Sequence, residues 1–331
     1  MLEKPIRRAS GDGATPLVGI LSNCASTQNR RRLAAVRRLV AREPHVFHFQ
    51  FEDIRSIPEG LRLFADARVG LIVINGGDGT IQATLSSIIN DNPFRTVPPL
   101  AILPGGRTNM IAADLGARGR PERVLRKLFR IVARGRLDRH LTERAIITLD
   151  VGDGAPPRAG LFFGTGGVVN GIEWCRRRIH PLRIPSALGH AISIAWLVLS
   201  ALVGVRSSPL RADPQTIVPD DGRRLHGRFA VVVATTLDCL LLGLRPFGED
   251  GTGGIKFSAI AFGRGPLWRA VIALALGRFS RGGMDGCHVG RADHIRIEGP
   301  VPVTLDGEIY RPCKGRPVVL HCPGNLSFVR L

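Results

Sequence analysis

Residues 75–80, with the sequence Asn-Gly-Gly-Asp-Gly-Thr, could bind and transfer a phosphoryl group. Glycine has no Cβ, so backbone N–H groups in this stretch can approach a phosphate closely. Thr80 and the residues after it predict the start of a helix, whose N-terminus favours anions. A carboxylate such as Asp78 repels phosphates unless a cation bridges them or it accepts a proton from an incoming hydroxyl. Both options indicate metal-assisted phosphoryl transfer; the alternative is a strand-to-helix turn without a ligand.

A second pair of acids follows a strand-like run near the C-terminus, in residues 303–308 (Val-Thr-Leu-Asp-Gly-Glu). An Asp-Gly pair is common in hairpin turns, so alone it is compatible with a purely structural role. A kinase that phosphorylates an alcohol, however, needs a carboxylate near the acceptor hydroxyl. If the second half of the chain folds back over the first, Asp306 or Glu308 would face residues 76–80, with the acceptor between them.

The first half of the chain alternates short apolar runs with helical periodicity. Residues 69–74 lack the polar–apolar alternation of a half-exposed strand, which is typical of a buried parallel strand. Alternating strands and helices predict a doubly wound parallel α/β sheet, with ligands at the carboxyl ends of its strands. Expected strands cover 17–21, 46–51, 69–74 and 99–103; expected helices cover 30–42, 57–67, 80–89, a segment from about 109, and 121–135. Small polar residues at three strand ends should converge: 22–23, 76–80 and 106–109.

From residue 145 onward the pattern changes to short apolar or alternating runs separated by turn residues, which predicts an antiparallel β-sandwich domain. Two helical insertions, 188–205 and 267–277, are unusually apolar for surface helices. They could line an apolar pocket or pack into a core. The expected organisation is a leader (1–15), an α/β domain (16–142) and the β-sandwich domain (143–331), whose last strand can return to the first domain.

The chain of 331 residues has a net charge of +19, and only four of its 46 basic residues are lysine. Positive charge attracts anionic surfaces, either nucleic acid or lipid headgroups. Aromatic residues make up only 5%, which disfavours a nucleic-acid partner that would stack its bases. Residues 121–135 predict a basic amphipathic helix, either with a solvated polar face or in contact with an anionic membrane.

The six cysteines form no C-x-x-C pair, and the polar, basic N-terminus does not resemble a secretory signal, so free thiols in a reducing cytoplasm are expected. Residues 187–205 are apolar over nearly the length of a membrane span, but His190, Ser193 and Ser200 interrupt them. We expect a buried helix there; an interfacial helix is the second alternative and a membrane-spanning helix the third. The chain has no P-loop, Rossmann or protein-kinase motif.

Three motifs together resemble the diacylglycerol kinase catalytic family of lipid kinases, which includes diacylglycerol, sphingosine and ceramide kinases, with NAD kinases as distant relatives. Residues 75–80 match the family's G-G-D-G-T loop, residues 103–109 its L-P-x-G-T-x-N segment, and residues 306–308 its late D-G-E. Asn23 falls where the family has an N-P-x-S-G turn. The resemblance covers most of the chain and implies an ATP-binding domain, a β-sandwich domain and a lipid hydroxyl as acceptor.

The resemblance also implies roles for individual residues. Asp78 would serve the metal–phosphate centre with Mg²⁺, and Glu308 would be the general base, supported by Asp306, although relatives leave open whether Asp78 or Glu308 is the base. The residues expected to hold the nucleotide are Asn23, Gly76, Gly77, Gly79, Thr80, Gly106, Arg107, Thr108 and Asn109. Arg107 and Met110 depart from the family's usual threonine and aspartate, and the first turn lacks its proline and glycine.

The resulting hypothesis is an ATP- and Mg²⁺-dependent lipid kinase, peripherally bound to the cytoplasmic face of an anionic membrane. Diacylglycerol is the expected acceptor; ceramide or a sphingoid base is the alternative. An NAD kinase-like soluble enzyme is disfavoured because the chain has no Asn-Glu dipeptide of the kind that would bind the nicotinamide ribose. A catalytically degenerate lipid-binding protein is a further alternative. The sequence leaves the oligomeric state open, with a homodimer among the alternatives.

Overall fold

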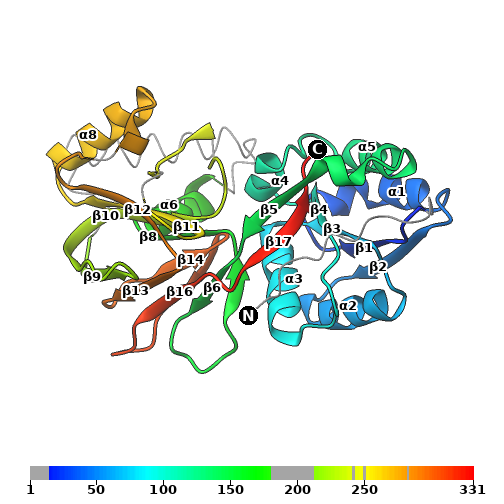
Figure 1. The fold of residues 1–331 in the computed structure, drawn as a ribbon, viewed down its shortest axis with the longest axis horizontal. Coiled ribbons are helices and arrows are strands. Elements are labelled where there is room, and N and C mark those ends of the chain that lie inside the picture. The colour runs from blue at the N-terminus through cyan, green and yellow to red at the C-terminus, as the bar shows by residue number, and fades with distance from the viewer. Residues whose placement is uncertain (1–14, 180–211, 241–242, 249–250, 282) are drawn as a thin grey trace. The chain divides into compact units, whose positions relative to one another are not determined.

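The computed structural model describes residues 15–179, 212–240, 243–248, 251–281 and 283–331 (Figure 1). By internal contacts the chain divides into two compact units, Met1–Arg144 with Gly324–Leu331, and Ala145–Pro323. The change of unit lies two residues from the boundary expected at 142/143. The last strand belongs to the first unit.

The first unit is built on a six-stranded sheet in the order β2-β1-β3-β4-β17-β5. The strands are β1 (Val18–Asn23), β2 (Val46–Phe51), β3 (Leu71–Gly76), β4 (Leu100–Pro104), β5 (Leu141–Ala145) and β17 (Asn325–Val329). Pairing is parallel from β2 through β17. Every residue of β1, β3 and β4 is buried, which explains their continuous apolar runs.

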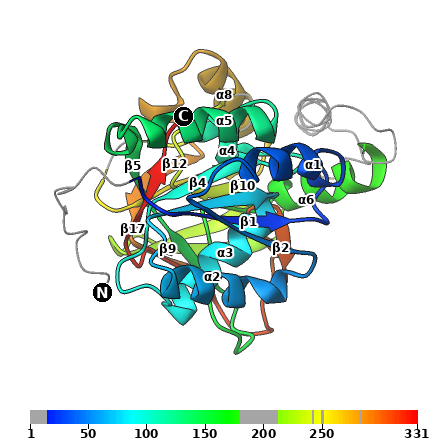
Figure 2. The same ribbon diagram turned by 90° about the vertical axis from the view of Figure 1, so that its right-hand side faces the viewer.

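Helices cover both faces of this sheet, which confirms the doubly wound α/β prediction (Figure 2). The helices α1 and α5 pack together on one face, and α2 and α3 pack together on the other. The helices are α1 (Asn29–Val40), α2 (Ile57–Asp66), α3 (Asp78–Asp91), α4 (Met110–Asp114) and α5 (Pro121–Ala133), with short 3₁₀ turns at Ile54–Ser56 and Leu137–His140. As its periodicity predicts, α5 buries Val124, Leu125 and Leu128 and exposes its basic residues.

The second unit is an antiparallel β domain, as expected. Its long central strand β10 (Leu225–Thr235) pairs with β9 through its first part and with β8 and β11 through its last part. Strands from both parts contribute to one buried apolar cluster, including Ile217, Phe163 and Phe257. The remaining strands are β6 (Ile147–Asp150), β7 (Arg158–Gly160), β8 (Phe162–Gly166), β9 (Pro214–Pro219), β11 (Ile255–Ala261), β12 (Cys287–Ala292), β13 (His294–Glu298), β14 (Val303–Leu305), β15 (Glu308–Tyr310) and β16 (Val318–His321).

Two helical segments accompany the described part of this domain. The helix α6 (Gly167–Trp174) continues into a π-helical turn, Cys175–Ile179, and was not predicted. The expected apolar helix at 267–277 is α8 (Arg264–Ala275), which packs Leu267, Ala270 and Ala273 into a small separate cluster. The other expected insertion, 188–205, lies outside the described residues. Within the described residues, no helix combines the length and hydropathy needed to cross a membrane.

Candidate functional site

The Gly76–Thr80 loop joins the end of β3 directly to the start of α3. Gly77 is the N-cap in an extended conformation, and its carbonyl accepts hydrogen bonds from the amides of Thr80 (2.9 Å) and Ile81 (3.1 Å). Asp78 is therefore the first helical residue, two residues before the helix start expected at Thr80. Because the amides that precede Thr80 have no carbonyl within the helix to pair with, this end of α3 is suited to bind an anion such as a phosphate.

The loop after β4 packs against the Gly76–Thr80 loop, backbone against backbone. A Cβ added to Gly105 would lie 2.8 Å from the amide nitrogen of Gly76, and one added to Gly106 would lie 2.5 Å from Cα of Gly77. Asn109 closes this second loop: its Oδ1 accepts a hydrogen bond from the Gly106 amide (2.8 Å), and its Nδ2 donates to the Gly106 carbonyl (3.0 Å). The two loops can approach this closely only because these positions are glycine.

A network of buried amides ties the end of β1 to the same place. Asn23 Nδ2 donates to Thr80 Oγ1 (2.9 Å). Asn29, which is 1% exposed, donates from Nδ2 to the backbone carbonyls of both Asn23 (2.8 Å) and Asn75 (2.9 Å). The amide of Gln28 donates to the Gly105 carbonyl (3.0 Å). The three strand ends expected to converge are thus joined by hydrogen bonds.

His48 on β2 supports this network from the neighbouring strand. Ser22 Oγ accepts a hydrogen bond from Asn75 Nδ2 (3.0 Å). The Ser22 hydroxyl can therefore donate its own proton in a hydrogen bond to His48 Nε2, which lies 2.8 Å from Ser22 Oγ. Burial, followed by the positive charge of Arg37, lowers the pKa of His48 from 6.5 to about 4. A neutral imidazole that accepts from Ser22 is consistent with both facts.

The structure therefore brings all the predicted nucleotide-binding residues to one edge of the first unit's sheet. Two of them, Asn23 and Thr80, are buried and bond to each other, which gives their side chains a positioning role. Asp78 and Thr108 are half-buried, and Arg107 is exposed. Among the described residues, no hydrogen bond or ion pair involves Arg107.

The second predicted cluster lies in the second unit, in the turn between β14 and β15. Asp306 is 5% exposed with a positive φ of 49°. Its carboxylate accepts hydrogen bonds from the amides of Leu161 (3.2 Å) and Phe162 (2.9 Å), and its own amide donates to the Phe162 carbonyl (2.8 Å). These bonds hold the turn against the start of β8, so Asp306 has a structural role.

Glu308, by contrast, projects toward solvent. Its side chain is 51% exposed, and its carboxylate pairs with Arg176 at 3.5 Å. The same guanidinium donates to the Gly307 carbonyl (2.9 Å), so it contacts the turn twice. Arg176 comes from the π-helical segment after α6. In the Asp-Gly-Glu turn the first acid is thus buried and engaged, while the second is accessible.

Three residues of these networks were not predicted as site residues. Asn29 and His48 support the loops of the first unit, and Arg176 holds the turn that carries Glu308. Asn29 had a sequence signal, because asparagine is favoured where a helix begins. His48 and Arg176 had none, since their partners are far away in the sequence.

No group of three or more His, Cys, Asp or Glu side chains with metal-binding spacing exists in the part of the chain that the structure describes. Mg²⁺ does not need such a group, because it is commonly held by one or two carboxylates together with substrate phosphates. Asp78 beside the glycine loops meets that requirement.

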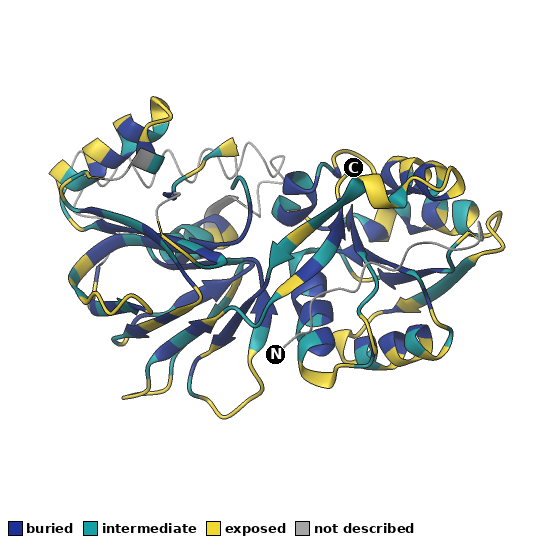
Figure 3. Cartoon of the chain, in the orientation of Figure 1, coloured by how far each residue is buried: buried dark blue, intermediate teal, exposed yellow. Residues whose placement is uncertain are grey.

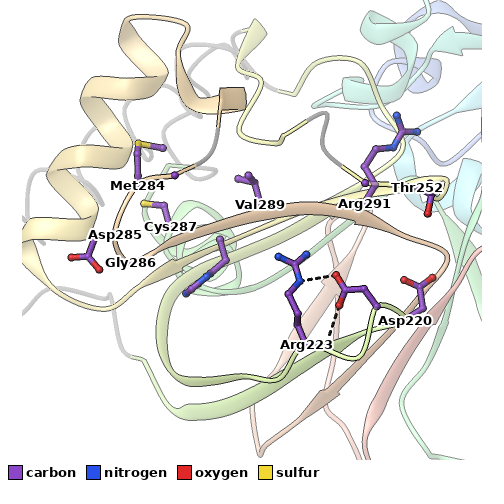
Figure 4. Close-up of a pocket in the computed structure, with 13 residues that line it drawn as sticks. Asp220, Arg223, Thr252, Met284, Asp285, Gly286, Cys287, Val289 and Arg291 are labelled. Carbon is purple, nitrogen blue, oxygen red and sulfur yellow. Dashed lines mark hydrogen bonds and ion pairs between the residues drawn. The ribbon is translucent and has the colours of Figure 1, made fainter.

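A pocket of about 620 Å³ in the second unit involves none of the predicted site residues (Figure 4). Its acids already have partners: Asp220 accepts from the amides of Asp293 and His294, and Asp221 pairs with Arg223. Asp220 and Asp285 lie far apart in it. Burial raises the pKa of the Cys287 thiol, which makes it a poor nucleophile.

Comparisons with known proteins agree with this geometry. Residues 18–136 match the family model of the diacylglycerol kinase catalytic domain. Two solved structures from Bacillus anthracis str. Sterne share the fold: a proposed diacylglycerol kinase (18% identity, TM-score 0.62, covering 95% of this chain and 96% of that one) and a diacylglycerol kinase (16%, 0.60, 97% and 98%). A yeast NADH kinase complexed with NADH aligns at 13% identity and a TM-score of 0.48, over 96% of this chain and 84% of that one.

Residues 18–136 thus match the diacylglycerol kinase catalytic domain, which confirms the resemblance drawn from the motifs over this part of the chain. The matched residues correspond to a kinase catalytic domain, and the solved structures share the fold of the chain.

We expect Gly106→Ala to weaken ATP binding and to lower the free energy of unfolding by about 1–3 kcal/mol, because the new Cβ, 2.5 Å from Gly77 Cα, must push two backbones apart. Titration with a fluorescent ATP analogue and urea unfolding would measure the two effects. Gly227→Ala is the control, since its Cβ would meet nothing closer than 3.9 Å. Normal affinity and stability in Gly106→Ala would mean that the contact between the loops is dispensable.

We expect His48 to make the protein less stable as the pH falls from about 6.5 to 4. The unfolded chain binds a proton at the ordinary pKa of 6.5, whereas the native state binds it only near 4, so acid favours unfolding in this window. The free energy of unfolding, measured across this range, should fall less steeply in His48→Gln than in the wild type. His45→Gln, a change at an exposed histidine, is the control. Parallel curves for His48→Gln and the wild type would contradict the assignment.

Proposed function

We propose that the protein is an ATP-dependent lipid kinase that transfers the γ-phosphoryl group to the hydroxyl of diacylglycerol, giving phosphatidic acid. The observation that carries this proposal is the pair of glycine loops, packed backbone to backbone inside residues that match the diacylglycerol kinase catalytic domain. Closely approached glycine backbones beside a helix N-terminus suit a polyphosphate, because fixed amide dipoles can reach its oxygens.

In this proposal the residues of the first unit bind and orient ATP. Amides of the Gly76–Thr80 loop contact the phosphates, and Gly106, Arg107, Thr108 and Asn109 line the nucleotide pocket. The exposed guanidinium of Arg107 is available for a phosphate contact, which would compensate for the threonine that the family usually has there. Asp78 would hold Mg²⁺ together with the phosphates, and the metal would neutralise the charge of the transferred group.

The transfer forms a bond between the acceptor oxygen and the γ-phosphorus while the bond from that phosphorus to the leaving oxygen of ADP breaks. The hydroxyl proton must pass to a base. Glu308 is our candidate because its carboxylate is half-exposed and anchored through Arg176. Asp306 supports it indirectly by fastening the turn. Asp78 is the alternative base, since it is the carboxylate of the Gly76–Thr80 loop.

The proposal is tested by transfer of labelled γ-phosphate from ATP, with Mg²⁺, to diacylglycerol, ceramide and sphingoid bases in mixed micelles, with NAD as a soluble comparison. We expect label on diacylglycerol and no turnover by Asp78→Asn. That variant should keep the wild-type circular dichroism and unfolding midpoint, because asparagine is tolerated at the beginning of a helix.

Label on ceramide or a sphingoid base would retain the reaction and change the acceptor. Label on NAD would overturn the lipid assignment. ATP binding without label on any acceptor would support a degenerate binding protein instead, and near-normal turnover by Asp78→Asn would remove its central role.

The two acids of the Asp-Gly-Glu turn should respond differently to loss of charge. Glu308→Gln should lower kcat by more than about tenfold with little change in stability, since general-base catalysis typically contributes at least that much. Asp306→Asn should instead lower the free energy of unfolding, because its carboxylate accepts buried backbone amides. Steady-state kinetics and urea unfolding of both variants make the comparison. A kcat loss well below tenfold in Glu308→Gln would reduce Glu308 to positioning the acceptor.

A further inference from the structure

The exposed large apolar side chains of the described residues are concentrated on one segment. Six such side chains are exposed, and four of them lie between residues 262 and 276. These four are Phe262 (47% exposed), Trp268 (50%), Ile272 (51%) and Leu276 (59%). Scattered single exposed hydrophobic residues need no explanation, but a group of large ones on one segment does.

Helical geometry places three of these four side chains in one stripe. Trp268, Ile272 and Leu276 are four residues apart, so they lie above one another along α8 and its C-cap. The opposite side of the helix, with Leu267 and Ala273, packs into its own cluster on the domain. Figure 3 shows α8 with a buried side and an exposed side. The helix is therefore fixed by its inner side and presents an apolar ridge outward.

Arginines flank this ridge. Arg264, Arg269 and Arg278 are exposed at the beginning, middle and end of the segment. Arg228 lies over the ring of Phe262, with its guanidinium carbon 5.5 Å from the ring centroid. Arg269 also pairs with Asp285 at 3.2 Å. The segment thus combines apolar bulk with positive charge.

This combination matches an anionic bilayer surface better than another protein. An interfacial helix has bulky apolar residues on the outer side with basic residues beside them, and tryptophan is favoured at the boundary between headgroups and acyl chains. Three arginines complement the negative headgroups, while the +19 charge of the chain would oppose pairing with a second copy.

We propose that the ridge formed by Trp268, Ile272 and Leu276, with Phe262 exposed just before the helix, docks the protein on anionic lipid bilayers, with Arg264, Arg269 and Arg278 at the headgroups. The purpose of this docking rests on the proposed function, since a lipid kinase must reach an acceptor held in a membrane. The binding itself needs no nucleotide and no turnover, so it can be measured independently of the kinase reaction.

The test is co-sedimentation with phosphatidylcholine vesicles, with and without phosphatidylglycerol, in the absence of ATP. We expect the wild type to bind the anionic vesicles, and we expect Trp268→Gln/Ile272→Gln to lose about tenfold or more of that binding because two inserting side chains are removed. The control is Ile54→Gln/Leu63→Gln, which removes two exposed apolar side chains of the first unit (50% and 39% exposed). It should bind like the wild type.

Equal binding of the α8 double variant and the wild type would overturn the proposal, as would an equal loss in the Ile54/Leu63 control. Concentration-dependent dimerisation that is abolished by Trp268→Gln/Ile272→Gln, with vesicle binding unchanged, would also overturn it by showing a second copy on this ridge. A depth measurement separates insertion from simple charge attraction: acyl-chain bromination should quench wild-type fluorescence more than that of Trp268→Phe.

Kinase assays separate this proposal from the proposed function. If both hold, the α8 double variant phosphorylates a water-soluble short-chain diacylglycerol normally and vesicle-embedded diacylglycerol poorly. If only the docking fails, the variant and the wild type act equally on both. If only the function fails, neither acts on any diacylglycerol while the difference in vesicle binding remains.

Discussion

The direct contact between two glycine pairs is the constraint on which the first unit's site depends. Gly76 and Gly77 at the end of β3 lie so close to Gly105 and Gly106 after β4 that no side chain fits between them. Parallel pairing of β3 and β4 brings the two strand ends to the same edge, and the absence of Cβ atoms lets their loops meet. Amide dipoles from both loops are thereby held at one place, and their arrangement does not have to be organised when an anionic ligand arrives.

Such a contact leaves polar backbone groups buried, and several of them form hydrogen bonds with surrounding side chains. Asn29 spans the carbonyls after β1 and β3, Asn109 closes the second loop on itself, and Asn23 fixes Thr80. Paired members of a buried polar network specify a single arrangement, and here the Nδ2 groups of Asn23, Asn29 and Asn75 are paired. Oδ1 of Asn29 and Oδ1 of Asn75 are buried without a hydrogen-bond partner among the described residues. His48 must be neutral to take part in this network, because a charged imidazole could not accept a hydrogen bond from the Ser22 hydroxyl.

Much of this unit can be predicted from the sequence because its strands are continuous apolar runs and its helices are amphipathic. Prediction was less complete where pairing partners are distant. The return of the last strand to the first domain was among the expectations, but no local pattern shows that β17 pairs with β4. In the second unit, β9 and β12 were not predicted, because only half of the residues of each strand are buried and polar residues interrupt the apolar ones. The motif strings placed Asn23, Asp78 and Asn109 at the site, but the partners of His48 and Arg176 depend on tertiary packing.

The Asp-Gly-Glu turn illustrates the same limit at the level of single atoms. In the sequence its two acids are equivalent, since both follow a strand and either could face a substrate. The turn makes them unequal: Asp306 adopts a positive φ and directs its carboxylate inward to the amides of β8, which leaves Glu308 as the accessible acid of the turn. A base that moves a proton must reach the reacting hydroxyl, whereas a carboxylate that holds a loop must stay ionised and bonded. One acid cannot easily satisfy both demands, so a motif with two acids allows the anchor and the reactive group to be separate residues.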